Sequence, residues 1–194
     1  MNTLKYAVIV DLQNDFITGT LGNKKSENIL KNVAMFIKDF DGDIIFTRDT
    51  HKNNYLETNE GKHLPVEHCV KGTLGHQIHR SLLGWKDAKV VDKPTFGSFE
   101  LKDEISSTIY FKRKKELAGT PEAFDYTVKK DKDIEIHFCG TCTDICVVSN
   151  AMILKAAFPE AKIVVHKKLC AGLDKEGHEA ALLVMQRCQI EVED

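Results

Sequence analysis

IEIHFCGTCTDICVVSNAMILKAA, residues 134–157, joins an apolar strand pattern to an amphipathic helix pattern through a turn with three cysteines. Its first positions alternate between apolar and polar residues from Ile134 to Phe138, as in a buried strand. After the turn, apolar residues recur at helical spacing at Ile145, Val148, Met152, Ile153 and Ala156. The stretch therefore predicts a strand followed directly by a helix, the unit from which parallel α/β sheets are built.

The turn also supplies a candidate nucleophile. Thr143 or Asp144 is placed to cap the helix, so that Cys146 falls in its first turn, where free backbone N–H groups and the helix dipole stabilise a thiolate. Cys139 and Cys142 form a CxxC pair that could be a thioredoxin-like redox couple, half of a zinc site, or small core residues. No second CxxC or His pair follows, and the helical period begins after Cys142. Core packing is therefore favoured for the side chains of both.

The composition indicates one cytoplasmic domain. The 194 residues contain no repeat and no long linker, and they suffice for a full core, so a single domain over residues 1–194 is expected. A net charge of −2 argues against nucleic acid or an anionic membrane as the main partner. No apolar run reaches the roughly 20 residues of a membrane span. Six unevenly spaced cysteines favour reduced thiols in the cytoplasm over a disulfide framework.

Strand-length apolar runs alternate with helical patterns along the whole chain. Strands are expected at 6–10, 43–47, 89–91, 134–139, 163–166 and 189–192, and helices at 26–40, 73–83, 144–157 and 175–187. This alternation predicts a three-layer α/β/α fold around a mostly parallel sheet of about six strands. The segment 100–132 has a helical start, a charged middle and a turn at 119–121, and it is interpreted as an insertion.

Chemically active side chains gather where the predicted strands end. Asp11 follows the first strand, Asp49 and His51 the second, Lys93 the third and Cys146 the fourth. In open parallel sheets, ligands bind outside the carboxyl ends of the strands. Carboxylate, imidazole, amine and thiol groups thus collect at one edge, which favours an enzyme over a catalytically silent binding or scaffold subunit.

Asp11 in VDLQNDF, Lys93 in KPTFGSF and Cys146 in GTCTDICV resemble the Asp–Lys–Cys set of the isochorismatase-like cysteine hydrolases, which include the nicotinamidases. The similarity continues into the tail CAGLDKEGHEAAL. It implies amide hydrolysis through a thioester on Cys146, with Asp11 acting first as general base and then as general acid. The positive charge of Lys93 would hold the Asp11 carboxylate in place and favour the Cys146 thiolate. It also implies a cis peptide bond between Thr141 and Cys142, and an oxyanion hole made by the N–H groups of Cys142 and Cys146.

Asp49, His51 and His68 form a second group. An Asp-x-His pair that leaves a strand, with a third ligand in the following loop, suits a divalent ion that keeps open positions. In nicotinamidase-like members the matching residues bind zinc or a related ion, and Glu60 lies where some members add a carboxylate ligand. The resemblance thus implies a divalent metal cofactor, zinc before others, and the alternative is a set of loop residues hydrogen-bonded to backbone.

The stretch Leu64-Pro65-Val66-Glu67-His68 departs from the W-P-x-H pattern usual in nicotinamidases, because the aromatic residue is absent and the loop is one residue longer. Phe16 is still available to stack on a flat ring. The expected substrate is therefore a small heteroaromatic carboxamide such as nicotinamide. An isochorismatase-like or carbamoyl-hydrolysing member, and a thiol oxidoreductase using Cys139 and Cys142, are the alternatives. Members of this superfamily are often dimers or tetramers, so a homo-oligomer is expected.

Overall fold

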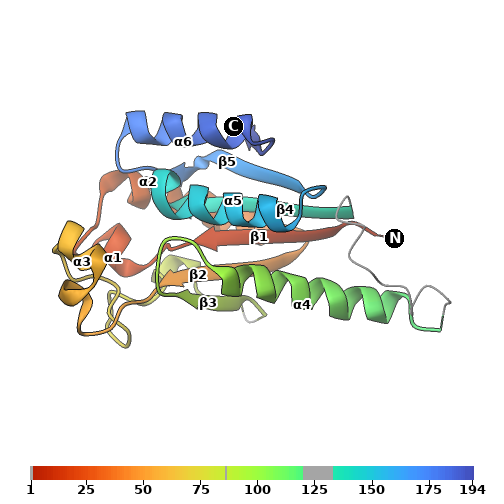
Figure 1. Cartoon of the computed structure of the whole chain (residues 1–194), viewed down its shortest axis with the longest axis horizontal. Helices are drawn as coiled ribbons and strands as arrows, with labels where there is room; N and C mark the ends of the chain where they lie inside the picture. Colours follow the sequence, from red (N-terminus) through yellow and green to blue (C-terminus); the bar gives the residue numbers. More distant parts are fainter. Residues whose placement is uncertain (1, 86, 120–132) are drawn as a thin grey trace.

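A single six-stranded sheet organises the computed structural model, which describes residues 2–85, 87–119 and 133–194 (Figure 1). The strands are β1 (Leu4–Val10), β2 (Asp43–Asp49), β3 (Lys89–Lys93), β4 (Ile134–Thr141), β5 (Lys162–Ala171) and β6 (Glu191–Glu193). Their order is β3-β2-β1-β4-β5-β6, and every neighbouring pair is parallel. The predicted α/β fold with a parallel sheet is confirmed.

Helices lie on both faces of this sheet. They are α1 (Asn14–Ile17), α2 (Lys24–Asp39), α3 (Asn59–His63), α4 (Phe99–Glu116), α5 (Val148–Ala157) and α6 (Lys175–Arg187). α4, α5 and α6 pack side by side over one face of the sheet, and α2 covers the other (Figure 1). The connection from β1 to β2 crosses the sheet in one direction, and those from β3 to β4, from β4 to β5 and from β5 to β6 cross it in the other, so right-handed crossovers place their helices on opposite faces. None of the helices in the described part of the chain is long and apolar enough to cross a membrane.

Side-chain caps set where the long helices begin. The side chain of Asn23 accepts a hydrogen bond from the Ser26 N–H at 2.9 Å and starts α2. Asp174 does the same for α6, accepting from the Gly177 N–H at 2.7 Å. These acceptors satisfy backbone donors that the first turn of a helix leaves unpaired. The helix expected at 175–187 is confirmed, and the one expected at 26–40 begins two residues earlier than predicted.

The prediction of a helix at 73–83 is wrong. Only Arg80–Leu82 forms a short 3₁₀ turn, and the rest of the segment runs beside the chain that follows β1. Its backbone groups pair there instead: the Asn14 N–H donates to the Gln77 carbonyl at 2.9 Å, and the His79 N–H donates to the Leu12 carbonyl at 2.9 Å. Pairing with a distant segment therefore overrode a helical spacing of apolar residues.

The segment interpreted as an insertion begins with α4, which packs on the sheet like the other long helices. α4 turns Leu101, Ile105 and Ile109 toward the sheet, where all three are buried. The later part of the predicted insertion, 120–132, lies outside the described residues.

The chain reverses its direction of travel across the sheet between β1 and β4. From β1 it proceeds to β2 and β3 on one side, and from β4 to β5 and β6 on the other. A sheet of this kind opens a crevice at the carboxyl ends of the two strands that flank the reversal. At that edge Val10 of β1 lies in register with Gly140 of β4. Gly140 has a φ of 127°, and a Cβ atom there would lie 2.1 Å from the Val10 carbonyl oxygen.

We expect Gly140→Ala to lower the free energy of unfolding by about 2 kcal/mol or more, because it adds both an unfavourable φ and a backbone clash. Gly72→Ala is the matched control. Gly72 also has a positive φ, 90°, but a Cβ atom there would meet no described residue beyond its chain neighbours within 4 Å. Urea unfolding of the two variants and the parent should rank Gly140→Ala as the more destabilised. Equal losses in both variants would contradict the close approach of β1 and β4.

Candidate active site

Lys93, the last residue of β3, places a buried ammonium group among two carboxylates and a thiol. Its Nζ lies 2.6 Å from Asp11 Oδ2, 3.4 Å from Asp49 Oδ1 and 3.5 Å from Cys146 Sγ. It also donates to the Thr95 carbonyl at 3.1 Å. Burial alone would lower the pKa of Lys93, but the charges of Asp11, Cys146 and Asp49 raise it well above its usual value. The lysine is therefore a fixed positive charge at the centre of the strand ends.

Asp11 follows β1 with a left-handed backbone, φ 48°, which aspartate tolerates better than most residues. This backbone conformation directs the Asp11 carboxylate toward Lys93. The Thr47 hydroxyl of β2 donates to Asp11 Oδ1 at 2.6 Å, while Oδ2 faces Lys93. Burial raises the pKa of the Asp11 carboxyl, and Lys93 and Thr47 oppose that shift. Asp11 Oδ2 and Cys146 Sγ lie 2.6 and 3.5 Å from the same Lys93 Nζ, so the carboxylate lies beside the thiol whose proton it could take.

The turn that carries Cys146 is a π-helical turn over Thr143–Val147 that leads into α5. Cys142 is its N-cap residue, and no side chain in the described part of the chain makes a capping hydrogen bond. The predicted cap by Thr143 or Asp144 is wrong, because both side chains bond to the segment around the start of α6. The Thr143 hydroxyl pairs with His178 Nδ1 at 2.8 Å, and Asp144 Oδ1 accepts from the Leu173 N–H at 3.1 Å. These two bonds instead join the turn that carries Cys146 to α6 and the loop before it, in the same helical layer.

Two side chains complete the hydrogen bonding of this turn. The Ser149 hydroxyl donates to the Ile145 carbonyl at 2.6 Å. The Asn150 amide donates to the Cys146 carbonyl at 2.8 Å and to the Phe96 carbonyl at 3.0 Å, and its oxygen accepts from the Ser98 N–H at 3.0 Å. Asn150 is fully buried and so joins the turn of Cys146 to the loop that follows Lys93. Sequence reasoning missed it, although a polar residue four positions after the nucleophile on an apolar helix was a usable signal.

Burial opposes the thiolate that was expected at Cys146. Burial raises the pKa of Cys146 well above its ordinary value, and Lys93 opposes the shift only in part. Burial likewise raises the pKa of Cys139, and it raises that of Cys142 to about 11. A redox couple needs a thiolate of low pKa, so these two cysteines fit core packing better. The peptide bond between Thr141 and Cys142 is cis, as the family resemblance implied.

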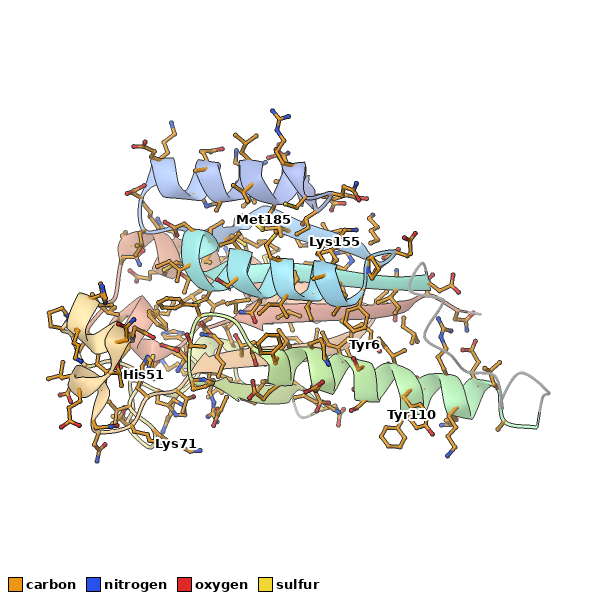
Figure 2. The ribbon with its side chains drawn as sticks, in the orientation of Figure 1. Tyr6, His51, Lys71, Tyr110, Lys155 and Met185 are labelled. Carbon is orange, nitrogen blue, oxygen red and sulfur yellow. The ribbon has the colours of Figure 1, made fainter. Side chains whose placement is uncertain are left out.

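Next to Asp11, Lys93 and Cys146, four further residues direct their ligand atoms toward one another, all within 4.8 Å: Asp49, His51, Glu60 and His68. We call these four residues the metal corner. His51 Nε2 and His68 Nε2 lie 2.8 and 3.3 Å from Asp49 Oδ2. Glu60 Oε1, on the short helix α3, lies 3.5 Å from His51 Nε2. Figure 2 shows His51 at the carboxyl-end edge of the sheet, close to α1 and α3.

The metal corner fits a divalent cation. His68 Nδ1 lies 2.7 Å from the Val66 carbonyl, which can only accept, so Nδ1 carries a proton and Nε2, 3.3 Å from Asp49 Oδ2, is the nitrogen that could bind a metal ion. Burial opposes ionisation of Asp49, but hydrogen bonds from His51 and His68 hold its pKa far below the usual range. Two imidazoles and two carboxylates around one point form a donor set typical of zinc and related ions.

The segment after Asp11 holds this corner in place. The Gln13 side chain accepts from the Asp49 N–H at 2.7 Å and donates to the Asp49 carbonyl at 2.8 Å. Phe16 packs its ring edge-on against His68, with ring centres 5.6 Å apart. The predicted ligands and Phe16 are thus brought together, whereas sequence reasoning did not single out Gln13. Its position between Asp11 and Phe16 in a segment that leaves a buried strand was the only available signal.

Comparison with known proteins places the chain among enzymes of one family. A family model described as the isochorismatase domain matches residues 5–194. The chain is 28% identical over 188 residues to an uncharacterized isochorismatase family protein, PncA, of Bacillus subtilis, with 92% of each chain covered. It is 26% identical over 182 residues to a nicotinamidase of Saccharomyces cerevisiae, which covers 77% of this chain and 80% of the yeast protein. A pyrazinamidase of Pyrococcus horikoshii, solved in complex with zinc, has a similar fold, with a TM-score of 0.73 at 23% identity over 97% of each chain.

We expect His68→Ala to weaken the tightest zinc binding by about 100-fold or more, because one of two imidazole donors is lost from the metal corner. Competition with a chromogenic zinc chelator measures the affinity. Thermal unfolding in the presence of chelator should change little, since His68 lies in a loop outside the sheet core. Unchanged zinc affinity in a folded variant would rule out the metal corner as the tight site.

Proposed function

The chain belongs to the isochorismatase family, and from that premise we propose that it is a cysteine amidohydrolase that cleaves a small carboxamide and releases ammonia. The observation that carries the proposal is the buried contact set at the sheet edge. Lys93 Nζ lies 2.6 Å from Asp11 and 3.5 Å from Cys146. A base, a cation and a nucleophile held together in a water-poor crevice are what thioester chemistry at an amide requires.

The first half of the reaction forms a thioester. Asp11 takes the proton of the Cys146 thiol as sulfur attacks the amide carbonyl, and the new C–S bond gives a tetrahedral oxyanion. The backbone N–H groups of Cys142 and Cys146 stabilise that oxyanion. Asp11 then returns the proton to the departing nitrogen, the C–N bond breaks, and ammonia leaves. Lys93 keeps its charge throughout and balances the negative charge that moves between carboxylate and sulfur.

The second half restores the enzyme by hydrolysis. Asp11, again a carboxylate, takes a proton from water as the water oxygen attacks the thioester carbonyl. Collapse of the second oxyanion breaks the C–S bond, and the proton on Asp11 returns to the Cys146 sulfur. The products are the carboxylic acid and a neutral thiol. Because burial raises the pKa of Cys146, we expect proton transfer to Asp11 to accompany the attack of sulfur on the carbonyl.

The metal corner supports a specific class of substrate. When bound there, a divalent ion supplies a Lewis-acidic contact for a ring nitrogen of the substrate. Asp49, His51, His68 and Glu60 would hold the ion. Zinc is the leading candidate because of the donor set and because the similar pyrazinamidase was solved with zinc. Phe16, which contacts His68 edge-on, can flank a flat ring that enters between the corner and Cys146.

A heteroaromatic carboxamide such as nicotinamide is therefore the proposed substrate. The yeast relative is a nicotinamidase, in keeping with this choice. Leu64, where nicotinamidases usually carry an aromatic residue, is aliphatic and 39% exposed, so no aromatic ring is available from this position. That feature favours a carbamoyl-type or other small amide as the alternative. A cytoplasmic location and a homo-oligomeric state stay predictions from cysteine usage and from the family.

Cys146→Ala should lower the turnover number by about 10⁴-fold or more, because no other thiol in the described part of the chain reaches the Asp11 and Lys93 pair. Cys139→Ala and Cys142→Ala should each keep a measurable share of the activity, since these positions contribute packing or backbone groups. Ammonia release under saturating substrate provides the comparison. Loss of activity only in the Cys139 and Cys142 variants, with a reversible disulfide between the two, would favour the oxidoreductase alternative.

Nicotinamide and pyrazinamide should both be hydrolysed, with ammonia release above the background of the Cys146→Ala protein. Both present a ring nitrogen and a carboxamide on a flat ring, so both match the corner, Phe16 and Cys146. Benzamide, which lacks the ring nitrogen, is the control substrate and should be cleaved more slowly. If only non-aromatic amides or carbamates react, the substrate assignment fails while the cysteine hydrolase assignment stands.

A further inference from the structure

Asn150 of α5 forms a buried bridge between the two segments that carry Lys93 and Cys146. Its side chain is fully buried. Its Nδ2 group donates to the Cys146 carbonyl at 2.8 Å and to the Phe96 carbonyl at 3.0 Å, and its Oδ1 accepts from the Ser98 N–H at 3.0 Å. The two carbonyls can only accept and the N–H can only donate, so the orientation of the amide is fixed. One side chain thus holds together two segments that lie far apart in the sequence.

The loop after β3 reaches the active site through the Thr95 carbonyl. This oxygen accepts a hydrogen bond from Lys93 Nζ at 3.1 Å, and the next residue in the chain is Phe96, whose carbonyl Asn150 holds. Residues 94–96 are exposed, so water competes for the hydrogen bonds of their backbone groups. The buried amide of Asn150 therefore anchors an exposed loop next to the point where that loop contacts the ammonium.

The ammonium of Lys93 has more neighbouring acceptors than it has protons to donate. Asp11 Oδ2 and the Thr95 carbonyl lie nearest, at 2.6 and 3.1 Å from Nζ. Asp49 Oδ1 and Cys146 Sγ follow at 3.4 and 3.5 Å. The contact to sulfur is the longest of these four, and a thiol sulfur accepts hydrogen bonds only weakly, so this contact depends most on where the surrounding segments lie. A shift of the loop or the turn would leave the pairing with Asp11 in place and lengthen the contact to Cys146.

We propose that Asn150 is a positioning residue for the nucleophile, because it joins the turn of Cys146 to the loop after β3 and so keeps the sulfur next to the Lys93 ammonium. The inference rests on the proposed function, since it gives Asn150 a part in the thioester chemistry. The hydrogen bonds of Asn150 go to backbone groups, so it acts through Lys93 and Cys146. Misplacing a reacting group by about 1 Å can lower a rate by about 100-fold, so a bridge outside the reacting atoms can still govern turnover.

Two variants of the full-length chain separate the bridge from the local bond within α5. Asn150→Ala removes all three hydrogen bonds. Asn150→Ser keeps a hydroxyl that can donate to the Cys146 carbonyl, but this shorter side chain cannot also reach the loop. With nicotinamide as substrate, both variants should lower the turnover number at least about tenfold and change KM by less than about threefold. Thr108→Ala is the matched control and should change neither, since Thr108 makes the same kind of bond, to the Glu104 carbonyl on α4.

The rate at which iodoacetamide labels Cys146 tests the same role without any substrate. Labelling follows the thiolate fraction, and the charge of Lys93 counteracts the burial that raises the pKa of this thiol. At neutral pH both Asn150 variants should therefore be labelled at least about threefold more slowly than the parent, as measured by mass spectrometry of the peptide that contains Cys146. A purely structural role predicts the opposite sign, because a loosened turn would expose the thiol and speed its labelling.

The two measurements distinguish a failure of this inference from a failure of the proposed function. Unchanged or faster labelling in the folded Asn150→Ser protein would overturn the positioning role, as would a turnover number equal to that of the parent. If the parent hydrolyses no amide while labelling of Cys146 slows in both variants, the positioning of the thiol by Asn150 stands and the proposed function fails.

Discussion

The buried ammonium of Lys93 is the interaction on which the rest of the site depends. Removing a charge from water costs several kcal/mol unless partners surround it, and here the partners come from three other parts of the sheet edge. Asp11 follows β1, Asp49 ends β2, and Cys146 lies in the turn after β4. The ammonium is stable only when all of these strands are in register. The sheet and the catalytic set are therefore formed together, and the crevice at the chain reversal is where their requirements coincide.

The sequence predicted the sheet and most of the site because both rest on local signals. Apolar runs of strand length identified the six strands, and the rule that ligands bind at the carboxyl ends of parallel strands placed Asp11, Lys93 and Cys146 at one edge. The same rule placed Asp49 and His51 together, and His68 and Glu60 followed from family resemblance. Each of these residues directly follows a strand or matches a short motif, so its neighbours in space could be named before any contact was known.

The errors came where distant segments decide the outcome. The predicted helix at 73–83 failed because its backbone pairs with the chain after β1, which no local period reveals. The expectation of a thiolate at Cys146 considered only the local helix start, whereas burial by the whole fold raises the pKa of that thiol and Lys93 opposes the shift only in part. Gln13 and Asn150 were overlooked because a single amide that bonds to several backbone groups has no sequence spacing of its own.

Asp49 gives the two halves of the site a common carboxylate, with Oδ1 toward Lys93 and Oδ2 toward His51 and His68. A cation held at Oδ2 would withdraw electron density from the oxygen that faces the ammonium, and the charge state of Cys146 would act back on the cation through the same carboxylate. Thermodynamic linkage makes this effect reciprocal. If a bound ion changed the ionisation constant of the Cys146 thiol by some factor, ionisation of the thiol would change the affinity for the ion by the same factor. Through the single side chain of Asp49, the affinity of the metal corner for a cation would therefore depend on the charge at Cys146.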